Sequence, residues 1–136
     1  MPSHVKDDDL ADKGRRLAVM AESLYLANLL VLPGIAFGAL FWLWLQHKDS
    51  APPLARQHLL QALWASVVSG VLIVCLSVGL VVLGGWHQPW TWVVVITYFV
   101  CVHGMLVLLG MFALAKAVAG QGWRYPLIVP RDGLAA

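Results

Sequence analysis

The run from Gln57 to Ala115 contains no Lys, Arg, Asp or Glu, and this charge-free run limits the possible folds more than any other feature. A second charge-free stretch covers residues 24–45. The chain of 136 residues is 60% hydrophobic and 12% charged, whereas soluble domains are about 45–50% apolar and about 25% charged. Because so short a chain has little interior in which to bury apolar surface, we expect an all-α integral membrane protein.

The long charge-free run is divided by a short turn at residues 84–89, which contains two glycines and a proline. We predict one helix from Leu54 to about Leu83 and another from about Trp90 to Ala119. Each is long enough to cross a hydrocarbon core of about 30 Å, so together they form a two-helix transmembrane hairpin. Tryptophans at the ends of the apolar segments, where indole rings reach the headgroup level, support these boundaries: Trp42, Trp44, Trp86, Trp90, Trp92 and Trp123.

The first apolar segment, from Leu17 to Leu45, is interrupted by Pro33 and Gly34. Proline removes a backbone donor and clashes with the preceding turn, so a kink or a break is expected. Residues 24–45 could form a single span of roughly 33 Å at about 1.5 Å per residue. Alternatively, the Pro-broken segment could be a helical hairpin that enters and leaves on one face, packed against protein. We favour the broken hairpin.

Three regions are expected: a polar N-terminal arm at residues 1–16, a helical membrane domain at 17–119 and an interfacial C-terminal tail at 120–136. Basic residues flank the open ends of the predicted hairpin but not its tip, namely Lys48, Arg56, Lys116, Arg124 and Arg131. The positive-inside rule therefore predicts a cytoplasmic C-terminus. We expect the membrane to be a bacterial inner membrane. The N-terminal arm, whose four basic residues are balanced by four aspartates, joins the C-terminus there only if the first segment is broken, so the side of Met1 stays open.

The histidines are the residues most able to bind a metal or a cofactor. His103 lies near the expected bilayer midplane, where an ionisable group is costly; it is either functional or a neutral imidazole bonded to Thr97, Ser66, Ser69, a helix carbonyl or a partner. His58 is predicted to form a solvated interfacial pair with His47. The heights of His58 and His103 differ by roughly 18 Å at about 1.5 Å per residue, too much for one haem. We expect no cofactor and no metal site.

Small residues repeat along the helix that follows Leu54. Ala62, Ser66 and Gly70 recur every four residues, and Cys75 and Gly79 extend the same face. Such spacing lets membrane helices approach closely, so we predict a helix-packing face, directed either at the rest of the chain or at another subunit. Cys75 and Cys101 are expected to be buried thiols rather than a disulfide.

Two motifs resemble a known family. An apolar helix end at Trp42 to Leu45, a loop with His47, Lys48 and Asp49, and a helix opening with Arg56, Gln57 and His58 form the first. The sequence from Gly120 to Pro126 forms the second. In these motifs the chain resembles the Tic-twenty-like family, small bacterial membrane proteins related to the twenty-kilodalton component of the chloroplast inner-envelope import machinery. The resemblance covers about Ala21 to Val129 and implies a compact helical membrane domain with cytoplasmic ends, and a distant analogy to translocation machinery.

Interfacial residues are expected at the polar end of the helices. The glycines after the last helix can end it, and Pro126 prevents it from resuming. Aromatic and arginine side chains there can lie at the headgroups and reach lipid phosphates. The predicted interfacial residues are Arg56, His58, Trp123, Arg124 and Tyr125.

The sequence contains no nucleophile motif, phosphate loop or carboxylate pair, so we expect no enzyme and no catalytic residues. We expect a non-catalytic accessory or assembly subunit that packs against a larger membrane complex; the alternative is a homo-oligomeric pore or translocation component. The expected partners are the lipid bilayer and other membrane subunits or copies of itself. A net charge of +2 gives no reason to expect nucleic acid.

Overall fold

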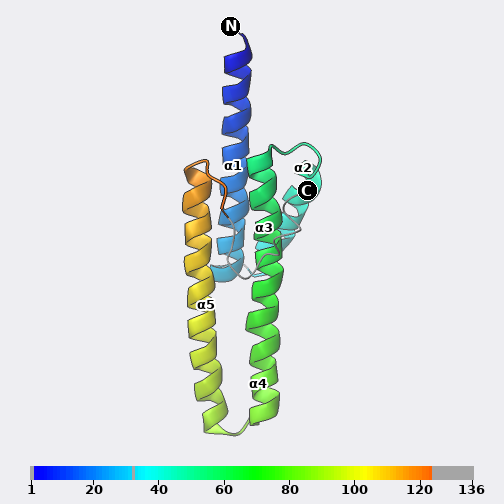
Figure 1. Cartoon of the computed structure of the whole chain (residues 1–136). Helices are drawn as coiled ribbons and strands as arrows, with labels where there is room; N and C mark the ends of the chain where they lie inside the picture. Colours follow the sequence, from blue (N-terminus) through cyan, green and yellow to red (C-terminus); the bar gives the residue numbers. More distant parts are fainter. Residues whose placement is uncertain (1, 32, 124–136) are drawn as a thin grey trace.

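The computed structural model describes residues 2–31 and 33–123, and this part of the chain is helical and contains no strand (Figure 1). The elements are α1 (Pro2–Leu30), α2 (Ile35–His47), α3 (Pro53–Gly70), a π-helical turn η1 (Val71–Cys75), α4 (Leu76–Gly84) and α5 (Pro89–Val118). The helices α3, η1 and α4 follow one another without a break, as one helical rod over Pro53–Gly84. The expected all-α class is confirmed.

The rod and α5 form an antiparallel hairpin (Figure 1). Both are long and apolar enough to cross a membrane by length and composition, and their bounds lie within one residue of the predicted ones. Gly85 has a φ of 87° in the turn, a conformation that L side chains rarely adopt. Pro89 stands in the first turn of α5, where its missing N–H costs no hydrogen bond. Gly84 and Thr91 touch directly, so the two helices meet closely at this tip.

The first apolar segment is broken, as favoured from the sequence, and the single-span alternative is wrong. α1 ends at Leu30 and α2 begins at Ile35. Gly34 takes a φ of 88°, and its N–H donates to the Asn28 Oδ1 at 3.0 Å. This bond satisfies one of the donors that the start of α2 leaves without a helical partner. α2 then runs back towards the level where α3 begins (Figure 1).

The N-terminal arm is part of α1 rather than a separate element. α1 is continuous from Pro2, and its first half projects beyond the other helices (Figure 1). Side chains 4–11 are exposed, and burial begins at Gly14 and Leu17. The expected boundary near residue 16 therefore falls inside a helix, at the point where α1 meets the rest of the fold.

The core lies where α1, α2, α3 and α5 run side by side, at the open end of the hairpin (Figure 1). Its buried apolar residues include Leu17, Ala21, Tyr25, Leu40, Leu43, Ala55, Leu59, Ala62, Ala65 and Ala113. In contrast, η1 and α4 bury no residue. Cys75 and Cys101 lie in this exposed part as free thiols, so the expectation that they are buried is wrong.

The rod changes its winding at η1. A π-helical turn holds one residue more than an α-helical turn, so one carbonyl there loses its usual amide partner. The Tyr98 hydroxyl of α5 donates to the Leu72 carbonyl inside this turn. The π turn therefore has a bond across the hairpin that an unbroken α-helix would not offer.

Candidate functional site

A buried polar cluster joins α1 to α3 near the open end of the hairpin. Glu22 of α1 and His58 and Gln61 of α3 have no exposed surface. His58 Nδ1 lies 2.7 Å from Glu22 Oε1, and Gln61 Nε2 donates to the same oxygen at 3.3 Å. On the other side of the ring, His58 Nε2 lies 3.0 Å from the carbonyl oxygen of Gln121, just after α5. We call Glu22, His58, Gln61 and the Gln121 carbonyl the buried clasp.

The hydrogen-bond partners of the His58 imidazole determine which of its nitrogens carry a proton. A backbone carbonyl only accepts, so His58 Nε2 carries a hydrogen and donates it to Gln121. The bond between His58 Nδ1 and Glu22 Oε1 then holds one proton, on the ring as an imidazolium or on the carboxyl as an acid. In both cases the pair has no net charge, which greatly lowers the cost of burying it.

Local sequence explains how the clasp closes. Several of the buried residues of both helices are alanines, and small residues let helix backbones approach closely. Those on α1 and α3 that are fully buried are Ala18, Ala21, Ala55, Ala62 and Ala65. His58 and Gln61 are three apart on α3 and so share a face.

The expected solvated pair of His58 with His47 is wrong, because His58 is fully buried. Its partner Glu22 lies 36 positions earlier and meets it only once α1 folds beside α3. A position of His58 at the membrane interface stays a prediction. His47 instead bonds the Leu43 carbonyl of its own helix at 3.0 Å. The sequence signal that could have revealed the clasp is Glu22 itself, a carboxylate in an otherwise apolar segment, which requires a partner.

The clasp connects α1, α3 and the segment after α5 through hydrogen bonds to both ring nitrogens of His58. Both nitrogens of His58 are engaged, so the ring could bind a metal or take a proton from a substrate only after losing Glu22 or Gln121. Among residues 2–31 and 33–123, no group of three or more His, Cys, Asp or Glu is placed to hold a metal ion.

His103 lies on α5, away from the clasp. Its ring is half-buried and stacks on Phe99 with centroids 5.1 Å apart. Its Nδ1 is buried without a hydrogen-bond partner, and so is the Ser66 hydroxyl, one of the partners expected for it. Another expected partner, Ser69, donates instead to the Ala65 carbonyl at 2.6 Å. The structure thus does not join His103 Nδ1 to these serines.

The predicted packing face is divided. Ala62 and Ser66 are buried, whereas Gly70 is exposed and a Cβ there would meet nothing within 4 Å. Contact of this face with another subunit stays a prediction. Of the interfacial residues, Arg56 is exposed and Trp123 packs against the core. Arg124 and Tyr125 lie outside the described residues.

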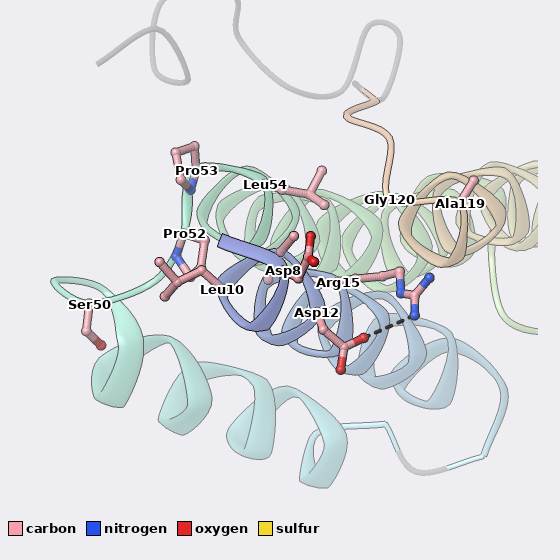
Figure 2. Close-up of a pocket in the computed structure, with 12 residues that line it drawn as sticks. Asp8, Leu10, Asp12, Arg15, Ser50, Pro52, Pro53, Leu54, Ala119 and Gly120 are labelled. Atoms are coloured by element: carbon pink, nitrogen blue, oxygen red, sulfur yellow. Dashed lines mark hydrogen bonds and ion pairs between the residues drawn. The ribbon is translucent and has the colours of Figure 1, made fainter. Parts of the chain in front are cut away.

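A surface groove of about 830 Å³ opens between the first half of α1, the segment before α3 and the end of α5. Figure 2 shows Asp8, Asp12 and Arg15 on α1, with Pro52 and Pro53 at one side of the groove and Ala119 and Gly120 at the other. Arg15 Nη2 lies 3.1 Å from Asp12 Oδ1, and Arg16 pairs with the same carboxylate at 3.0 Å. This groove was not predicted, because nothing in the sequence indicates that residues 52–54 lie against α1.

Comparison with known families corrects the family assignment. Residues 13–131 match the sequence profile of the MamF/MmsF family, described as the magnetosome magnetite crystal formation protein family. This match overturns the resemblance to the Tic-twenty-like family. The short motifs behind that resemblance, apolar helices with aromatic and basic ends, recur among membrane proteins because the bilayer interface favours them. No curated protein and no solved structure matches the chain.

Proposed function

The chain belongs to the MamF/MmsF magnetosome magnetite crystal formation protein family, and on this premise we propose that it is a membrane-embedded, non-catalytic accessory or assembly subunit in magnetite crystal formation. The family match over most of the chain is the observation that carries this proposal. The distribution of apolar and aromatic surface, described next, supports its membrane part.

Exposed tryptophans form two belts along the hairpin. Trp42 of α2 and Trp64 of α3 are 60% and 45% exposed, and Trp86 and Trp90 at the tip are 64% and 76% exposed. Trp64 and Gly84 are separated by roughly 30 Å along the rod at about 1.5 Å per residue. That spacing equals the thickness of a typical hydrocarbon core, about 30 Å, with indoles at both boundaries.

Between the belts, the hairpin offers lipid an almost continuous apolar surface. In the most apolar 18-residue stretch of the rod only 6% is buried inside the protein, and in the corresponding stretch of α5 only 17% is buried. Exposed side chains there include Val71, Val74, Val78, Ile96, Val100 and Leu108. So much uncovered apolar surface is characteristic of a segment surrounded by lipid or by partner helices. We place it in the magnetosome membrane.

The charged residues define the orientation that we propose. Lys48, Arg56 and Lys116 all lie at the open end of the hairpin, and the tip at residues 84–89 contains no charge. With the break at Pro33, α1 begins at that same end (Figure 1). The positive-inside rule then puts both ends of the described chain in the cytoplasm.

The buried clasp supports the proposed role as an assembly subunit, because it gives the protein a fixed surface that other subunits can bind. It joins α1, α3 and the segment after α5, and so fixes the end of the fold that carries the charges. Gly70 is the point on the predicted packing face where another helix could approach without disturbing the interior.

The test is made in the host bacterium. We expect deletion of the gene to change magnetite crystal size or number in electron micrographs, and the wild-type copy to restore it. A tagged copy, extracted in mild detergent, should co-purify with other magnetosome membrane proteins. Gly70→Leu should weaken that association without unfolding the chain, whereas Val78→Leu, at a side chain 56% exposed on α4, is the matched control. Unchanged crystals after deletion, or recovery of the protein alone, would contradict the proposal.

A further inference from the structure

The turn between α1 and α2 reaches only part of the way along the hairpin. A Cβ on Gly110 of α5 would lie 2.6 Å from Leu26 Cδ2 and 2.8 Å from the Tyr25 ring, so these residues are at one level. Gly110 is roughly 30 Å from the start of α5, and Val31 is roughly 9 Å closer to the tip than Tyr25, at about 1.5 Å per residue. At this helix rise the turn therefore stops roughly 20 Å short of the tip. Figure 1 shows that the hairpin continues beyond the turn.

The two tryptophan belts mark the boundaries of the hydrocarbon core, so the position of the α1–α2 turn can be given as a depth in the bilayer. With the tip belt at one boundary of a hydrocarbon core of about 30 Å, the α1–α2 turn lies about 10 Å inside the opposite boundary. One leaflet contributes about half of that core, about 15 Å. The turn thus stays within the leaflet next to the open end, which we call the near leaflet.

The surface of the turn suits contact with acyl chains. Leu30, Val31 and Ile35 are 58%, 71% and 71% exposed, and none of them carries charge. The Asn28 side chain accepts a hydrogen bond from the Gly34 N–H. This bond satisfies a backbone donor that lipid could not satisfy. At the other end of α2, the charged Lys48 lies over the Trp44 ring at 5.8 Å, as expected at a headgroup level.

These depths give the protein different widths in the two leaflets. At these depths the near leaflet holds the last turns of α1, the first turns of α2, the end of α3 and part of α5, whereas only α4 and the first half of α5 cross the far leaflet. Figure 1 shows that α1 and α2 accompany the hairpin only on the side of its open end. Each helix is about 10–12 Å across with its side chains. Four helices displace about twice as much lipid area as two, so the membrane domain is a wedge.

We propose that this wedge makes the protein prefer strongly curved bilayers, with the near leaflet on the convex side. The inference rests on the proposed membrane function and adds a partner to it, namely a bilayer of small radius such as that of a vesicle. The physical reason is packing, since a convex leaflet has a larger area per lipid at its surface and accommodates the wider half of the wedge with less strain.

The first experiment measures depth in the full-length chain. Cys75 and Cys101 are exposed free thiols, so both can be replaced by serine, and a single cysteine can then be placed at Ile35 or at Val82, which is 74% exposed near the tip. After reconstitution and labelling, lipids carrying quenchers at defined acyl positions report depth. The wedge requires the Ile35 label in the near half of the bilayer and the Val82 label close to the far boundary. An Ile35 label in water, or in the far leaflet, overturns it.

The second experiment measures curvature preference. Labelled full-length protein is offered a mixture of small sonicated and large extruded vesicles of one lipid composition, and the amount per lipid area in each is compared. We expect a several-fold enrichment in the small vesicles. Val31→Asp, which puts a charge at the exposed turn, should reduce the enrichment, and Leu10→Asp, in the exposed first half of α1, should not. Circular dichroism checks that both remain helical.

The outcomes separate the two proposals. Insertion with equal density in both vesicle sizes overturns the wedge and leaves the membrane function intact. Equal enrichment of the wild type and Val31→Asp also overturns the wedge, because the turn then contributes nothing. Failure to enter either kind of vesicle contradicts the membrane placement itself, and with it both proposals.

Discussion

Replacement of Glu22 by alanine should destabilise the protein more than any other single side-chain truncation at the clasp. Glu22 Oε1 accepts from Gln61 at 3.3 Å and shares a proton with His58 at 2.7 Å, and all three side chains are fully buried. Breaking a buried pair by removing one partner costs about 3–5 kcal/mol, because the other is left desolvated. Glu22→Gln preserves the shape and one hydrogen bond to the ring, so it should cost about 1–2 kcal/mol.

The free energy of unfolding can be followed in mild detergent through the tryptophan fluorescence, with Ser23→Ala at the exposed neighbouring position as control. The double variant Glu22→Ala/His58→Ala should cost clearly less than the sum of the two single variants, since each single change already breaks the same pair. A loss below about 1 kcal/mol for Glu22→Ala, or strict additivity in the double variant, would refute the clasp as a stabilising unit.

Three further predictions concern packing and backbone geometry, each measured as a change in the free energy of unfolding. Gly34→Ala should destabilise by about 1–2 kcal/mol because its φ of 88° is left-handed. In contrast, Gly38→Ala, in a helix with free space around it, should be neutral or slightly stabilising. Gly110→Ala should cost about 1–3 kcal/mol by forcing α1 away from α5, and Gly104→Ala, where nothing lies within 4 Å, should cost far less. Tyr98→Phe should cost about 1 kcal/mol and speed amide exchange in η1, because the Leu72 carbonyl loses its donor; unchanged exchange would contradict that account.

The helices of the hairpin could be predicted from the sequence because their signals are local. A charge-free run gives the length, a proline marks the first turn of each long helix, and glycines mark the turn between them. The break at Pro33 is also local, because proline acts on its own preceding turn. For these elements, predicted and observed bounds differ by a single residue.

The pairing in the clasp could not be predicted, because Glu22 indicates only that some partner is needed, and the partners come from segments that meet only in the folded chain. His58 beside Arg56 in a polar stretch has the pattern of a solvated interfacial residue, and its burial depends on Glu22 in α1 and on Gln121 after α5. The π turn has no local signal either, since residues 71–75 are aliphatic residues and a cysteine, much like the rest of the rod. The residue that accounts for the π turn is Tyr98 on the other helix of the hairpin, whose hydroxyl donates to the Leu72 carbonyl.

The π turn also determines which side of the rod the residues beyond it face. One additional residue in a turn rotates everything beyond it by about 100° around the helix axis relative to an unbroken α-helix. The stripe of small buried residues through Ala62 and Ser66 therefore does not continue in register to Gly79, and no residue of α4 is buried. A partner helix that fits this stripe would follow it along α3 alone and would diverge from the rod where the phase changes, below Gly70.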